Sequence, residues 1–122
     1  MLSKSHYEEL LTWLELLRAY DLLWSNDPNN LGLLKQNLTQ IQTYLETKIM
    51  LIDRTDLDPE ARSIFQAWQT ETHRYIRLLQ TDFLFYQSAK QTKTKLDRIL
   101  LIQQRLKLAI ELTENYLTVI AK

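Results

Sequence analysis

The histidines and paired carboxylates of this chain do not fall at the spacings that bind a metal ion. Helix bundles hold di-iron centres with Glu-x-x-His motifs, and neither His6 nor His73 follows a glutamate at that spacing. Glu111 and Glu114 are three residues apart, but they fall on the polar side of the final predicted helix. We therefore expect no metal site and no other cofactor.

Nucleophilic catalysis lacks its usual residues as well. The 122-residue sequence has no cysteine, no serine flanked by glycines, and no histidine with an evident orienting partner. A phosphate-binding loop needs several glycines before a helix, and Gly32 is the single glycine. The sequence thus predicts no catalytic residues and a non-enzymatic protein.

Basic residues gather near the start of the final predicted helix. The net charge is zero, with an acidic first half and a basic second half that could pack against each other. The basic residues of segment 90–107 are Lys90, Lys93, Lys95, Arg98, Arg105 and Lys107. Such a patch could neutralise phosphates, so a nucleic-acid-binding regulator is one alternative. No helix-turn-helix spacing or aromatic platform accompanies it, so an acidic, partly hydrophobic protein partner is the better fit.

One carboxylate lies among apolar residues. Asp82 stands between Leu78 and Phe85 on one face of a predicted helix, with no Lys or Arg three or four residues away on that helix. A carboxylate beside an apolar surface needs a partner or water. We expect Arg98 from the final helix, or an arginine of another chain, to pair with it; the alternative is that Asp82 stays hydrated.

The elements that position these residues are predicted to be helical throughout. Apolar side chains recur every three or four residues over about residues 5–25, 31–52, 59–90 and 94–121. Asp58 is a favourable N-cap, with Pro59 at the first helical position. Short connections make successive helices antiparallel neighbours. We predict an all-α fold over residues 1–122, a single helical domain built as an up-down-up-down antiparallel four-helix bundle with long helices 3 and 4.

The sequence offers no sign of a membrane segment. No stretch approaches the roughly 20 apolar residues that span a bilayer. The opening residues MLSKSHYEELL lack the apolar core of a signal peptide. We therefore expect a cytoplasmic protein with no membrane partner.

The third predicted helix is longer than the first two. At 1.5 Å per residue, segment 59–90 measures about 48 Å, about 15 Å more than its predecessors. If its start is level with the start of helix 1, residues 80–90 and the first turns of helix 4 project as an uncovered tip. We predict that this tip binds a protein partner through Leu84, Phe85, Lys90, Lys93, Arg98 and Leu101. The alternative is that the tip is covered within the chain.

The last predicted helix carries more apolar surface than one core stripe requires. A second row, formed by Leu108, Leu112 and Val119 together with Leu101, lies well round the helix from the first row. This row predicts a homodimer face. Two alternatives are that helices 1 and 4 press broad faces together, and that the chain is a purely structural homo-oligomeric module.

The segment RLLQTDFLFYQSAK (77–90), followed by the basic, glutamine-rich RILLIQQRLKLAIELTENYL (98–117), resembles the PatD-like heterocyst frequency control proteins of filamentous cyanobacteria. The matching residues are Arg77, Leu78, Leu79, Asp82, Phe85, Ala89 and Lys90. The resemblance implies a non-enzymatic regulator that limits how many cells differentiate into heterocysts. It also implies direct binding to the tubulin-like division protein FtsZ, with modulation of FtsZ assembly.

Overall fold

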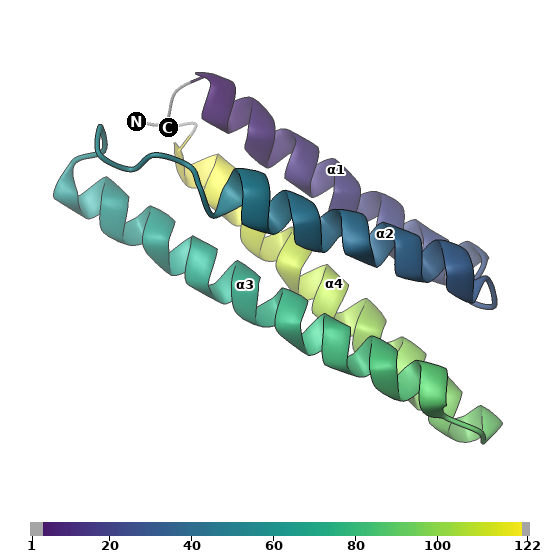
Figure 1. Ribbon diagram of the computed structural model, residues 1–122. Coiled ribbons are helices and arrows are strands. Elements are labelled where there is room, and N and C mark those ends of the chain that lie inside the picture. The colour runs from purple at the N-terminus through teal and green to yellow at the C-terminus, as the bar shows by residue number, and fades with distance from the viewer. Residues whose placement is uncertain (1–3, 121–122) are drawn as a thin grey trace.

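The computed structural model describes residues 4–120, and within this range every regular element is helical. The elements are α1 (Lys4–Asn26), α2 (Leu31–Tyr44), a π-helical turn η1 (Leu45–Ile49), α3 (Pro59–Ser88) and α4 (Thr92–Ile120) (Figure 1). The predicted all-α class is therefore confirmed. The two long helices are confirmed too, since α3 has 30 residues and α4 has 29.

The four helices pack against one another side by side. Figure 1 places the α1–α2 and α3–α4 connections at one end of the molecule and the α2–α3 connection at the other. The most extensive packing joins α3 to α4, and α1 packs against both α4 and α2. The contact between α2 and α3 is much smaller than these. None of the helices within residues 4–120 is long and apolar enough to cross a membrane.

Two aromatic groups fill much of the core. Near one end, the Trp24 ring packs nearly perpendicular to the rings of Phe83 and Tyr86, with centroids 5.9 and 5.0 Å away. Near the other end, Phe65, Trp68 and Tyr116 stack with centroids 5.5–5.8 Å apart. Burying an aromatic side chain of this size stabilises a fold by about 1.5–3 kcal/mol relative to leaving it exposed. These side chains therefore join α3 to both α1 and α4.

Helix α3 begins where the sequence predicts, but helix 2 changes its conformation before its predicted end. The Asp58 carboxylate accepts a hydrogen bond from the Ala61 backbone N–H at 2.8 Å, and Pro59 opens the helix. The predicted helix over 31–52 instead changes at Tyr44 into the π-helical turn η1. Residues 50–58 form an irregular connection in which Ile52 and Leu57 are buried. The predicted start at residue 94 falls two residues late, and position 121 lies outside the described residues.

The predicted ten-residue overshoot at the C-terminal end of helix 3 is wrong. The Tyr86 hydroxyl donates to the Pro28 carbonyl at 2.7 Å, so the α1–α2 connection reaches the last turn of α3. At the opposite end, Gln69 Nε2 donates to the Ile49 carbonyl at 2.9 Å. The ten residues of α3 before Gln69 therefore extend past η1, alongside the folded connection 50–58. The extra length lies at the N-terminal end of α3, because that connection is longer than the assumed tight turn.

Candidate functional site

Asp82 is buried between α3 and α4 and pairs with two arginines. The residue is 4% exposed. Arg98 Nη1 donates to Oδ1 at 3.4 Å, and Arg105 Nε donates to Oδ2 at 3.3 Å. The two arginines are seven residues apart, which is two turns of α4, so both can reach a carboxylate that lies level with the turn between them. The expected pairing with Arg98 is confirmed, the hydrated alternative is wrong, and Arg105 is a partner that the sequence did not single out.

Arg98 also covers an exposed aromatic ring. Its guanidinium carbon lies 4.4 Å from the centre of the Phe85 ring. Phe85 is 50% exposed, so the outer part of the ring remains open to solvent. A cation over a ring face contributes about 0.5–1 kcal/mol at an exposed site. The contacts with Asp82 and Phe85 together hold a long side chain in one place on the surface, which lowers the conformational entropy that it would lose on binding a partner.

The residues predicted for the tip do not form one surface. Leu84 and Phe85 are consecutive, and consecutive residues of a helix point about 100° apart. Phe85 faces Arg98 of α4, whereas Leu84, which is 65% exposed, lines a groove with Lys35 and Thr39 of α2. The structure therefore joins Phe85 to Arg98 and places Leu84 on the α2 side of α3.

The other predicted tip residues lie on or near the first turns of α4. Leu101 is half-buried one turn after Arg98. Lys90, in the α3–α4 connection, and Lys93, in the first turn of α4, are both exposed. These positions place exposed positive charge at the end of the α3–α4 pair. Positive charge at this end of the molecule attracts an acidic partner.

The first turns of α4, which the sequence analysis placed in the uncovered tip, carry two further exposed apolar side chains that were not assigned to the binding surface. Leu96 and Leu100, both on α4, are exposed. Gln103 Nε2 donates to Ser25 Oγ at 3.3 Å, which places the last turn of α1 level with Gln103. The first turns of α4 therefore extend beyond the end of α1. Their exposure could have been predicted by comparing the lengths of helices 1 and 4, because α1 is the shorter of the two.

The predicted dimer face on α4 is partly used inside the chain. Leu112 is half-buried and packs against the core, and Leu108 is half-buried as well. Val119 is exposed. Over part of its length this row therefore borders the buried side of α4. That agrees with the alternative in which helix 4 packs inside the chain through a broad face. The homodimer stays a prediction.

The basic segment is divided by the Asp82 pairing. Arg98 and Arg105 direct their guanidinium groups to a buried carboxylate. The exposed lysines of the segment are Lys90, Lys93, Lys95 and Lys107. Fewer cations are therefore free for a phosphate backbone than the sequence count suggests, which weakens the nucleic-acid alternative.

Neither metal ligation nor similarity to known proteins adds to this geometry. Among the described residues, no three His, Cys, Asp or Glu side chains gather at metal-binding distances. No protein-family model matches the chain, and no similar chain was found among curated proteins or solved structures. The surface around Phe85 and Arg98 is accordingly the candidate site on physical grounds.

Proposed function

We propose that this chain is a non-enzymatic regulatory protein that binds a protein partner through its tip surface, defined as Phe85, Lys90, Lys93, Arg98 and Leu101. The observation that carries the proposal is the position of Arg98, fixed between the buried Asp82 and the exposed ring of Phe85. Aromatic and arginine side chains dominate the binding energy of protein interfaces. Here one of each is held in place, with exposed apolar neighbours, at the end of the bundle.

The proposed partner is FtsZ, as the resemblance to the PatD-like proteins implies. In this proposal the chain is an up-down-up-down bundle in the cytoplasm that limits heterocyst frequency by modulating FtsZ assembly. An acidic partner is complementary to the exposed Lys90 and Lys93. The ring of Phe85 would be buried against an apolar part of the partner.

The proposal is tested by measuring the affinity of the chain for purified cyanobacterial FtsZ. Phe85→Ala should weaken binding by about thirtyfold, or about 2 kcal/mol, if the ring is a buried anchor. The matched control is Ile64→Ala, which truncates an exposed apolar side chain near the other end of the same helix. Equal effects of the two substitutions, or no binding of FtsZ by the unaltered chain, would contradict the proposal.

Charge reversal provides a second measurement. Lys93→Glu should slow association with FtsZ and reduce its salt dependence, because Lys93 is an exposed cation of the tip surface. The effect on the dissociation rate should be small. Sedimentation of FtsZ filaments with and without the chain then reports whether binding alters assembly.

A further inference from the structure

The groove that Leu84 lines is a hollow of about 280 Å³ between α2 and α3, called here the α2–α3 hollow. Each of the two helices contributes four residues in the same i, i+3, i+4, i+7 spacing, which is one face of a helix. They are Lys35, Leu38, Thr39 and Gln42 from α2, and Gln80, Phe83, Leu84 and Gln87 from α3. The hollow therefore belongs to the packing of α2 against α3, which is much less extensive than that of α3 against α4.

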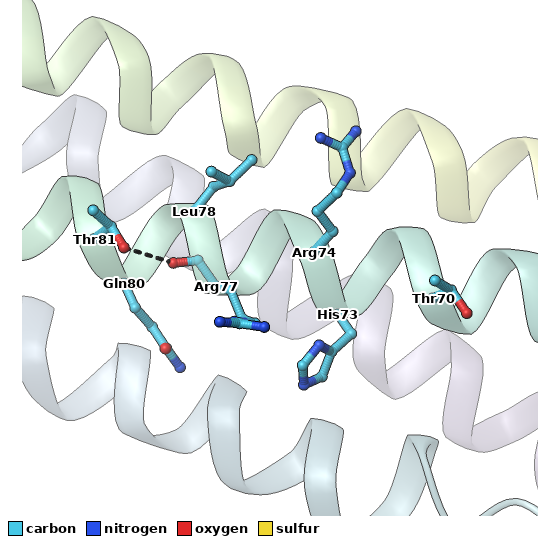
Figure 2. Close-up of a pocket in the computed structure, with 7 residues that line it drawn as sticks. All are labelled: Thr70, His73, Arg74, Arg77, Leu78, Gln80 and Thr81. Carbon is cyan, nitrogen blue, oxygen red and sulfur yellow. Dashed lines mark hydrogen bonds between the residues drawn. The ribbon is translucent and has the colours of Figure 1, made fainter.

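A larger hollow of about 530 Å³ shares Gln80 with the α2–α3 hollow but is built differently. Residues of α3 alone line it, and none of them is buried. Figure 2 shows these side chains, with Arg77 and Gln80 projecting toward α2 and Arg74 projecting toward α4. This second hollow is an open depression among exposed and half-buried side chains, so the α2–α3 hollow is the better candidate for a ligand.

The buried part of the α2–α3 hollow is apolar. Leu38 and Phe83 are buried, and Leu84 is 65% exposed on the same lining. A ligand with an apolar body would remove part of this surface from water, which contributes about 25 cal/mol per Å² of apolar area. Apart from Lys35, the other lining residues carry amide or hydroxyl groups. An apolar surface with a few polar groups that orient the ligand is typical of small-molecule sites.

The charge around the α2–α3 hollow is positive. Lys35 is its one charged lining residue; it is exposed, and no salt bridge holds it within residues 4–120. Helix α2 contains no Asp or Glu, and the one carboxylate in residues 72–88 of α3, Asp82, is paired with two arginines of α4. Arg77 projects toward α2 as a second cation without a salt bridge among the described residues. The hollow therefore attracts a negatively charged group.

We infer that the α2–α3 hollow binds a small amphipathic carboxylate. Its short alkyl or aromatic body lies against Phe83 and Leu84, and its carboxylate accepts charge-assisted hydrogen bonds from Lys35. The volume is below the range of about 300–1,000 Å³ that is usual for drug-sized ligands, so the ligand is a smaller molecule. The site uses none of the residues of the tip surface, so the inference does not depend on FtsZ being the partner.

The test uses octanoate, titrated into the full ¹⁵N-labelled chain. Amide shifts should concentrate near Thr39 of α2 and Leu84 of α3. Octanamide has the same number of non-hydrogen atoms as octanoate but no charge, and it should bind about tenfold more weakly. Acetate has the charge without the apolar chain, and it should leave these amides unshifted at the same concentrations.

Substitutions assign the two contributions to residues. Lys35→Gln should weaken octanoate binding by about tenfold and leave octanamide binding unchanged. Lys48→Gln is the matched control, because it removes an exposed lysine of η1 that does not line the hollow, and it should have no effect. Leu84→Ser should weaken octanoate and octanamide alike, by about fivefold. Because Leu84 is exposed, this variant should fold normally.

Four results would overturn the inference. One is the absence of shifts with octanoate. The second is equal affinity for octanoate and octanamide, which would mean that the site has no preference for a carboxylate. The third is an equal loss of affinity from Lys35→Gln and Lys48→Gln, which would reduce the effect to general charge attraction. The fourth is that the shifts gather around Phe85 and Leu100, because amphipathic molecules would then adsorb to the exposed apolar side chains at the end of the bundle.

Discussion

The buried carboxylate of Asp82 holds Arg98 in place, with 3.4 Å between Oδ1 and Nη1, and Arg98 in turn lies 4.4 Å from the centre of the Phe85 ring. A buried group of α3 thus fixes a surface side chain of α4 against a second surface residue of α3. Because Asp82 is screened from water by the helices, its position follows from core packing. The arrangement links the stability of the α3–α4 pair to the shape of the tip surface.

Phe83 and Phe85 should differ sharply in their contribution to folding. Phe83 is buried against Trp24, so Phe83→Ala leaves a cavity and should lower the free energy of unfolding by about 3–5 kcal/mol. Phe85→Ala removes a half-exposed ring and one cation–π contact, and should cost about 1 kcal/mol. Urea denaturation of both variants measures the difference. Similar losses would show that the Phe85 ring belongs to the core.

Thr72 and Thr113 form a second matched pair. Both are fully buried, but the Thr113 hydroxyl donates to the Ala109 carbonyl at 2.9 Å, whereas the Thr72 hydroxyl has no hydrogen-bond partner within the described chain. A buried polar group without a partner costs about 1–3 kcal/mol. Thr72→Val should therefore raise the free energy of unfolding by about 1 kcal/mol, and Thr113→Val should leave it unchanged or slightly lower. A loss of stability in Thr72→Val would indicate a water or a partner at that hydroxyl.

Alkaline pH should destabilise the fold through its buried tyrosines. Burial raises the pKa of Tyr116 to about 12, and burial also raises the pKa of Tyr20 above its ordinary value. In the unfolded chain a tyrosine has a pKa of about 10. Between pH 10 and about 12 the unfolded state therefore loses protons that the folded state keeps, so stability is full below pH 10 and falls as the pH rises.

The measurement is the urea midpoint at several pH values from 8 to 11. Tyr116→Phe keeps the ring that stacks on Phe65 and Trp68 but removes the ionisable hydroxyl. It should reduce the slope of stability against pH above 10 and have little effect on stability at pH 8. An unchanged slope would assign the alkaline loss to other groups.

Much of the helical layout could be predicted from the sequence, because it depends on local signals. The Asp58–Pro59 start of α3 needs only a cap and a fixed φ angle, both of which are properties of adjacent residues. Phe65, Trp68, Ile76 and Phe83 recur at helical spacing, and all are buried. Gln69 and Asp82 are buried as well. The spacing of apolar residues cannot predict that Gln69 and Asp82 are buried, because their burial depends on partners from other segments. Gln69 donates to the Ile49 carbonyl, and Asp82 accepts from Arg98.

The arrangement of the candidate site could not be predicted in the same way. The lengths of helices 1, 3 and 4 were predicted closely. The offset of α3 against α1 and α2 depends on how the connection 50–58 folds, and the spacing of apolar residues does not determine that. Leu84 and Phe85 are neighbours in the sequence, yet one faces α2 and the other faces α4. Which neighbour each would face depends on the rotation of α3 within the bundle.

The Asp82 cluster makes a prediction about coupling between three residues. The Asp82 side chain is 6% exposed, while Arg98 and Arg105 are 30% and 28% exposed. If one arginine is replaced by methionine, the other still compensates the carboxylate, so each single substitution should cost about 1–2 kcal/mol. Replacing both leaves a buried charge without a partner, and the loss should reach about 3–5 kcal/mol or more.

Asp82→Asn should cost less than the double replacement, about 1–2 kcal/mol, because both arginines are near enough to the surface to turn toward water. A double-mutant cycle in urea provides the coupling energy between Arg98 and Arg105. Binding provides a second readout, since Arg98→Met should weaken a partner at the tip surface and Arg105→Met should not, despite similar effects on folding. If the stability losses of the two arginine substitutions simply add, the effect of one arginine does not depend on the other. The prediction that each arginine compensates Asp82 in the absence of the other would then be wrong. If Arg98→Met and Arg105→Met weaken binding equally, the partner does not depend on the contact between Arg98 and the Phe85 ring.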